Sequence, residues 1–391
     1  MKQLNVCAFF ALPALSLAQF PARPTDLTSI RSKVDSSVEI SYKQVSLSTH
    51  TPSHYAKSCR RKSVRHQRAS SPYGGYVHMP GAILSDVGGF NISTYFLYFE
   101  ARNNPSTAPL AVYLPGGAGE SSVYTALASE TGPCYVNTAG NATELNPWSF
   151  NNNVNMLYID QPVQTGFSYD RLVNGTFNLT PEIITPLEFN SSTAVAATDP
   201  LTTWGTFPSQ DPLSTTNTTV ASARAVWHFG EHWLSSFPPF STSSSSNKIS
   251  FWGNSYGGLW APEVAARFSK NFKSLPATHP LKPKDMVVDT LGLTNGCIDF
   301  EQALPGFPEY AYNNTYGVQF LSEAQYNAAM DNLTSPGGVL DLIKTCRTLG
   351  LAGDPQFFGN NETVNEVCGE AFAQGYAVIA ASDALNNVCI F

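Results

Sequence analysis

The sequence predicts an α/β fold in which a mostly parallel central sheet is flanked by helices, and three observations support this. Apolar runs with strand character occur at 110–114, 155–159, 248–252 and 286–293. Segments 221–237 and 259–268 have helical periodicity and alternate with these strands, which favours a parallel sheet covered on both faces. The pentapeptide GNSYG at 253–257 joins a predicted strand to a predicted helix.

The elements follow one another along the chain in a clear order. The N-terminal third is polar and turn-rich as far as an apolar run at 96–99, and strand 110–114 leads directly into a glycine-rich loop at 115–119. Helix 221–237 has Val226, Phe229 and Trp233 near one face, and a serine-rich loop at 241–246 precedes the strand before GNSYG. From residue 301 onward the chain is predicted to be mainly helical and irregular, and there is no internal repeat.

The first residues predict the compartment. Lys2, an apolar stretch at 4–17 and the sequence Ser-Leu-Ala at 16–18, which resembles a cleavage site, are typical of a signal peptide over 1–18, so we expect the mature chain to start at Gln19. No later stretch is long and apolar enough to cross a membrane. We expect a secreted protein, or one held in a vacuole-like compartment, and nine glycosylation sequons agree with this: Asn91, Asn141, Asn174, Asn178, Asn190, Asn217, Asn313, Asn332 and Asn361.

Cysteine usage and charge exclude several classes of function. Six cysteines remain after residue 18, an even number that favours disulfides but allows 15 pairings. No C-x-x-C motif or combined cysteine and histidine spacing predicts a metal site, and we expect no cofactor. The net charge of −7 argues against nucleic acid as a partner. A basic cluster at 57–68 departs from this balance; we interpret it as a solvated or processed loop in preference to a nucleic-acid patch.

The motif around Ser255 predicts a catalytic serine. It fits the G-x-S-x-G turn between strand and helix that exposes a nucleophilic hydroxyl, and Gly253 and Gly257 stand where side chains would crowd the backbone. An acyl intermediate needs backbone N–H donors for its oxyanion, and Tyr256 and the loop at 116–117 are the candidates. That loop lacks the G-K-[ST] ending of a phosphate cradle.

Several stretches together resemble the serine carboxypeptidase family. Segment 253–262 looks like its G-E-S-Y-G-G-x-Y-x-P, segment 113–122 (YLPGGAGESS) is similar to its W-L-N-G-G-P-G-C-S-S, and segment 155–169 (NMLYIDQPVQTGFSY) to its N-V-L-F-L-D-Q-P-V-G-T-G-F-S-Y. The resemblance runs from about residue 73 to the end. It implies an α/β-hydrolase core over 19–299, a helical cap-like insertion over 300–391, and hydrolysis of C-terminal residues from peptide or protein substrates, with Ser255 as nucleophile and Gly117 and Tyr256 as oxyanion donors.

The sequence departs from the family where the substrate's terminal carboxylate would bind. The family's asparagine before the glycine pair and glutamate before the serine are here Pro115 and Asn254, whereas Gly116 and Glu130 match. The resemblance thus implies Asn254, Gly116 and Glu130 as carboxylate-binding residues and leaves a secreted esterase or acyltransferase as an alternative. Two further departures, at 120 and 164, place a glutamate and a glutamine where the family has small residues.

The rest of the triad is not evident. His279 is the only histidine after Ser255, and it lies in a proline-flanked stretch that is typical of a surface loop. The family's aspartate and histidine follow its cap insertion, so we assign neither role here and expect the 391-residue chain to be inactive as given. A non-catalytic glycoprotein of the same fold is therefore a further alternative. A zinc peptidase is a remote one, because His228, Glu231 and His232 fit the H-x-x-E-H pattern.

Overall fold

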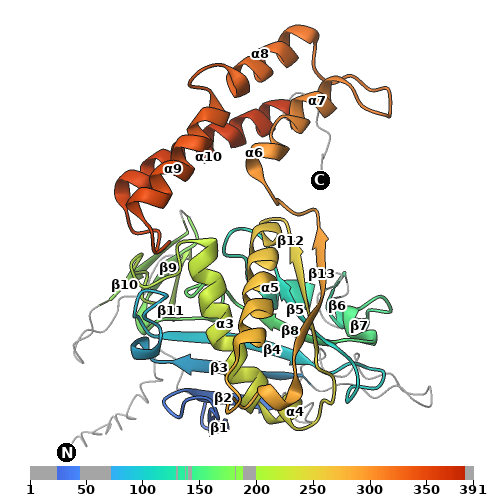
Figure 1. Cartoon of the computed structure of the whole chain (residues 1–391), viewed down its shortest axis with the longest axis vertical. Helices are drawn as coiled ribbons and strands as arrows, with labels where there is room; N and C mark the ends of the chain where they lie inside the picture. The colour runs from blue at the N-terminus through green and yellow to red at the C-terminus, as the bar shows by residue number, and fades with distance from the viewer. Residues whose placement is uncertain are drawn as a thin grey trace, which may run out of the picture.

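A central eight-stranded sheet organises the computed structural model of the chain (Figure 1). The structure describes residues 24–44, 72–128, 131–136, 138–139, 143–180, 182–187 and 200–383. The strand order is β1-β2-β3-β4-β8-β5-β12-β13. The bounds of these strands are β1 Thr28–Arg31, β2 Glu39–Gln44, β3 Tyr73–Met79, β4 Ile92–Phe99, β5 Leu110–Leu114, β8 Asn155–Ile159, β12 Lys248–Asn254 and β13 Val287–Thr294.

The sheet has two halves that differ in strand direction. Strands β8, β5, β12 and β13 pair in parallel, whereas β1, β2, β3 and β4 pair antiparallel with their neighbours. The predictions of β5, β8, β12 and β13 are confirmed to within two residues. The antiparallel half was largely missed, because β1–β3 carry many polar residues and glycines and only the last residues of β4 form an apolar run.

Helices cover both faces of the sheet, as the α/β prediction requires. Helices α3 (Thr219–Ser236) and α5 (Gly257–Ser274) pack on one face and bury the large aromatic core, and the short α4 (Pro238–Ser241) follows α3 (Figure 1). Helix α2 (Ser122–Ala128) packs on the opposite face through a second cluster that includes Val123 and Ala126. Successive side chains of β4 point to opposite faces of the sheet and so contribute to both apolar clusters. Phe96 and Tyr98 face α3, and Leu97 faces α2.

Shorter strands and single helical turns lie around the central sheet. Strands β9 (Leu172–Asn178), β10 (Ile183–Pro186) and β11 (Thr202–Pro208) form a three-stranded antiparallel sheet, and β6 (Cys134–Val136) pairs with β7 (Thr143–Leu145). Three single turns of 3-10 helix lie at Gly81–Ile83, Phe150–Asn152 and Lys282–Lys284. The sequence did not predict the three-stranded sheet, because its strands are polar and only half-buried.

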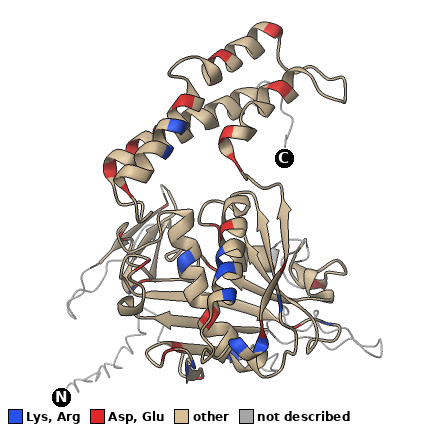
Figure 2. Cartoon of the chain, in the orientation of Figure 1, with Lys and Arg blue, Asp and Glu red and all other residues tan. Residues whose placement is uncertain are grey.

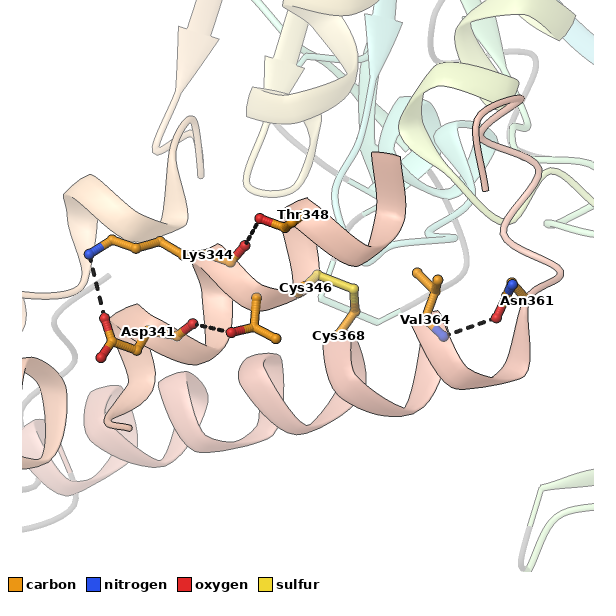
Figure 3. Close-up of a disulfide and its surroundings, with 8 residues drawn as sticks. Asp341, Lys344, Cys346, Thr348, Asn361, Val364 and Cys368 are labelled. Carbon is orange, nitrogen blue, oxygen red and sulfur yellow. Dashed lines mark hydrogen bonds and ion pairs between the residues drawn. A yellow bond between two sulfur atoms is a disulfide. The ribbon is translucent and has the colours of Figure 1, made fainter. Parts of the chain in front are cut away.

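After the sheet the chain is helical, as predicted. Helices α6 (Phe300–Ala303), α7 (Gly306–Tyr312), α8 (Glu323–Thr334), α9 (Val339–Gly353) and α10 (Glu362–Asp383) have their own small apolar core. A disulfide between Cys346 and Cys368 joins α9 to α10 (Figure 3). Segment 300–383 contains ten acidic and only two basic residues, and red therefore dominates this part of Figure 2.

Two groups of contacts hold the helical segment: one lies at its first helix, and the other joins it to α3. Arg347 of α9 forms ion pairs with Asp299, at 3.1 Å, and with Glu301, at the beginning of α6. At the other end, the loop 354–361 between α9 and α10 lies against the N-terminus of α3, where Arg224 Nη1 donates to the carbonyl of Gln356 at 2.6 Å (Figure 1). These contacts place the helical segment over the end of the sheet at which β12 and β13 terminate.

Several predictions lie outside the described residues. They are the signal peptide at 1–18, the basic cluster at 57–68, Glu130, and the sequons at Asn141 and Asn190. Within the described ranges, no helix is long and apolar enough to cross a membrane. Cys134 is disulfide-bonded, whereas Cys297 is exposed and unpaired.

Candidate active site

Ser255 lies on a sharp turn between the end of β12 and the start of α5. Its backbone has φ +54°, a left-handed conformation that costs a residue with a side chain about 1–3 kcal/mol. The flanking glycines make the turn sterically feasible: a Cβ on Gly253 would lie 2.2 Å from the carbonyl oxygen of Gly257, and one on Gly257 would lie 2.2 Å from that of Leu114. The steric argument made from the sequence is thus confirmed.

The glycine-rich loop after β5 is pressed against the serine. A Cβ on Gly116 would lie 2.7 Å from Ser255 Cβ and 3.0 Å from its Oγ, so only glycine fits. Gly117 follows with φ +104°, and Tyr256 immediately precedes α5. Neither the amide of Gly117 nor that of Tyr256 donates a hydrogen bond to a described residue. Among the described residues, both amides are therefore available as donors, as an oxyanion hole requires.

A buried carboxylate that sequence reasoning did not single out holds this loop in place. Asp160, at the end of β8, is fully buried and accepts hydrogen bonds from Ser121 Oγ at 2.8 Å and Phe167 N at 2.9 Å. Burial raises the pKa of Asp160, although these hydrogen bonds oppose the shift. The aspartate thus ties the loop after Gly117 to the loop that follows β8. The D-Q-P sequence at 160–162 was the signal that could have located it.

Asn254 lies beside the serine and is half-buried. Burial and the negative charge of Glu120 raise the pKa of the nearby Tyr113, and the Asn254 side chain opposes this shift. A Cβ on Gly116 would lie 3.2 Å from the carbonyl oxygen of Asn254. The structure therefore brings Asn254 and Gly116 together at Ser255.

A cavity of about 330 Å³ adjoins this site. It is lined by 118–119 and 162–165, by 215–219 at the start of α3, and by Ser222, Tyr256 and Trp260, and its walls carry no charged side chain. Gln164 positions one wall, because its Nε2 donates to the carbonyls of Asp211, at 2.8 Å, and Ser214, at 3.1 Å. A larger hollow of about 520 Å³ lies over β1–β4, but none of the loop or elbow residues lines it.

Each described histidine has its own partners, and none contacts Ser255. His279 Nε2 lies 3.7 Å from Glu231 Oε2. Its neighbours at 276–278 and 280 are exposed, as expected of a surface loop, but the His279 side chain itself is only 9% exposed. The loop containing it folds back onto α3, which buries the ring. The other three bond as follows: His78 to Ser41 and Ser93, His228 to Asp86 and Glu231, and His232 to Ser32.

The pattern that suggested zinc does not assemble a metal site. Both ring nitrogens of His228 are occupied, by Asp86 at 2.9 Å and Glu231 at 3.2 Å, whereas His232 points to Ser32 at 2.8 Å. Across the described ranges, no group of three or more histidine, cysteine, aspartate or glutamate residues is arranged to hold a metal ion. The H-x-x-E-H pattern is therefore a structural part of α3.

The sheet order, the strained serine turn and the glycine loop define an α/β-hydrolase. The family model of the serine carboxypeptidases matches residues 63–368, and the chain belongs to this family. Carboxypeptidase S1 homolog A of Trichophyton verrucosum is 38% identical over 369 residues, and a carboxypeptidase Y homolog of Arthroderma benhamiae is 36% identical over 356 residues. These alignments cover 92% and 90% of this chain but 53% of each relative, so the chain spans about half the length of the curated relatives it matches. A solved prohormone-processing carboxypeptidase from Saccharomyces cerevisiae aligns with a TM-score of 0.45 at 20% identity, over 78% of this chain and 53% of that one.

Proposed function

We propose that Ser255 is the nucleophile of a serine-type carboxypeptidase that removes C-terminal residues from peptides. The observation that carries this proposal is the strained turn of Ser255 against Gly116, with the unpaired amides of Gly117 and Tyr256 beside it. A protein that only bound peptides would have no reason to hold a serine in a conformation that costs stability.

The chemistry follows from these groups. Ser255 Oγ attacks the carbonyl carbon of the last peptide bond, its proton passes to a base, and the oxyanion accepts hydrogen bonds from Gly117 and Tyr256. Collapse of this intermediate breaks the C–N bond and releases the C-terminal amino acid, which takes the proton; water then hydrolyses the acyl-enzyme. Since the described histidines bond elsewhere, we infer that the base comes from outside the described residues.

The terminal carboxylate is proposed to bind at Asn254, Gly116 and Glu130. The Asn254 amide can donate to a carboxylate at any pH, whereas a glutamate at this place must be protonated to do so. The uncharged cavity that reaches Tyr256 is proposed to take a substrate side chain, and the sequons and signal pattern support secretion or a vacuole-like compartment.

Labelling with a fluorophosphonate tests the nucleophile without assuming a substrate. In a form that contains the base we expect stoichiometric labelling of Ser255, its loss in Ser255→Ala, and retention in Ser274→Ala, a matched control at the exposed end of α5. Peptide hydrolysis by Ser255→Ala should fall by about 10⁴-fold or more. Near-normal hydrolysis by this variant would refute the assignment. If the protein cleaved esters, or peptides with an amidated C-terminus, as readily as peptides with a free C-terminal carboxylate, an esterase or acyltransferase would be favoured.

Rapid labelling of the 391-residue chain itself would show that the chain contains a base, contrary to our expectation. His279 would then be the residue to test, because it is the only histidine that follows Ser255.

A further inference from the structure

Two sequon asparagines differ from the others in how their side-chain nitrogens are used. Of the seven that the structure describes, only Asn217 and Asn361 donate hydrogen bonds through Nδ2 to described residues. Asn361 donates to the carbonyl of Gly353 at 3.0 Å, and its Oδ1 accepts from Val364 at the start of α10 (Figure 3). Both asparagines lie where the loop 354–361 meets α3.

Asn217 lies in the contact itself. Its Nδ2 donates to the carbonyl of Pro212 at 2.8 Å and to Oδ1 of Asn360 at 3.1 Å, so both of its hydrogens are occupied. Gly359, with φ +75°, is packed so closely that a Cβ there would lie 2.6 Å from Asn217 Cβ. Thr218 Oγ1 donates to the carbonyl of Phe357 in the same contact.

A glycan on this nitrogen does not fit that arrangement. Transfer from a lipid-linked oligosaccharide diphosphate forms a bond between Nδ2 and the anomeric carbon of the sugar, breaks that carbon's bond to the diphosphate, and removes one Nδ2 proton. At least one of the two hydrogen bonds is then lost. Asn217 is exposed, and a sugar that replaces the hydrogen donated to Asn360 stands between Asn217 and the loop. Since 217–219 also line the cavity beside Tyr256, the change would reach the rim of the candidate substrate site.

We propose that Asn217 is a modification site whose N-linked glycan and the docked α9–α10 loop exclude each other. A sugar on Asn217 releases the loop from α3 and opens this side of the cavity; an unmodified Asn217 holds the loop down. The proposal does not depend on the chemistry of Ser255.

The loop offers a direct readout of docking, because chymotrypsin cleaves after exposed phenylalanines and the loop contains Phe357 and Phe358. A cut there leaves two fragments joined by the Cys346–Cys368 disulfide, so they separate only on a reducing gel. Because Cys134 is also disulfide-bonded, the masses of the fragments on the reducing gel then distinguish cleavage in the loop from cleavage elsewhere.

The test attaches a chitobiose maleimide to Asn217→Cys in the 391-residue chain carrying Cys297→Ser, with a single label verified by peptide mapping. The matched control is Asn313→Cys, a sequon asparagine at the exposed end of α7 whose side chain has no hydrogen bond to described residues. Labelling at 217 is expected to speed loop cleavage about tenfold or more relative to the unlabelled variant, because the contact is lost. Labelling at 313 should leave the rate within twofold.

Equal protection of the loop with and without the label at 217 would overturn the proposal. A second experiment compares wild-type protein from a glycosylating host with Thr219→Val, which lacks the sequon. If glycopeptide mass spectrometry finds Asn217 fully occupied in the wild type, and its loop is nevertheless as protected as that of Thr219→Val, the proposal is also overturned. Faster cleavage of the occupied protein than of Thr219→Val would support it.

Discussion

Replacement of His232 by asparagine should change how the free energy of unfolding depends on pH, because His232 is a buried side chain of α3. The imidazole is 1% exposed and contacts Ser32 Oγ at 2.8 Å. Burial lowers the pKa of His232 to about 4, so the folded protein keeps the ring neutral at pH values where the unfolded chain takes up a proton. The stabilisation is therefore complete above pH 6.5 and is lost as the pH falls toward 4.

The size of the effect follows from that pKa. The change from 6.5 to about 4 corresponds to about 3 kcal/mol, of which about 2.5 kcal/mol is lost by pH 4.5. At pH 7.5, His232→Asn should lower the free energy of unfolding by about 1–2 kcal/mol, through the weakened bond to Ser32 and poorer packing. At pH 4.5 the variant should equal or exceed the wild type, because asparagine does not titrate.

Urea unfolding of the 391-residue chain at pH 4.5 and 7.5, followed by tryptophan fluorescence, measures both values. His228→Asn is a control of opposite sign: burial disfavours the charged ring, but Asp86 and Glu231 outweigh this and raise the pKa of His228 to about 9. The stabilisation that His228 contributes is complete below pH 6.5 and is lost as the pH rises through 9. His228→Asn should therefore lower the free energy of unfolding by about 1 kcal/mol more at pH 4.5 than at pH 7.5. This value is reduced for solvent screening, because Asp86 is half-exposed. A cost of His232→Asn that is the same at both pH values would refute the reasoning.

Further predictions follow from the turn, the disulfide and the carboxylate site. Gly253→Ala places a Cβ within 2.2 Å of a backbone oxygen and should lower the free energy of unfolding by about 2–3 kcal/mol in the same assay. The control Gly306→Ala, whose Cβ would have nothing within 4 Å, should change it by less than about 1 kcal/mol. Similar losses in both variants would contradict the steric explanation. Replacement of Cys346 and Cys368 by alanine opens a loop of 22 residues and should cost about 3 kcal/mol in the unfolding of α9 and α10, seen by circular dichroism; an unchanged transition would contradict this. In a form with the base, KM should rise less with pH than in Asn254→Glu, because the amide does not ionise; identical profiles would mean that Asn254 does not bind the carboxylate.

Sequence motifs located the nucleophile well. A strand, a G-x-S-x-G turn and a helix are local features, and the steric need for Gly253 and Gly257 can be deduced from the turn motif alone. Strands β5 and β8 were predicted with their observed bounds because both are buried on both faces and carry continuous apolar runs. The resemblance to the serine carboxypeptidases rested on motifs of the same local kind.

Other parts of the fold could not be predicted from local pattern. Strand β1 pairs locally with β2, but β2 pairs with β3, and β4 with β8, across longer separations in the sequence. The polar residues of β1–β3 are therefore compatible with a sheet only once β4 lies beside β8. The role of Asp160 likewise depends on two loops that meet only in the folded chain.

The sequence by itself determined the family, the position of the nucleophile and the glycines that its turn requires, because these depend on residues that are neighbours in the chain. Only the tertiary structure decided the fate of the histidines and of Asn217. His228 and His232, four residues apart on one helix, have opposite pKa shifts, because one faces two carboxylates and the other a buried serine hydroxyl. Asn217 carries the same sequon type as Asn313, yet its amide donates a hydrogen bond to a loop more than 130 residues away. Long-range packing sets these environments, and no local pattern encodes them.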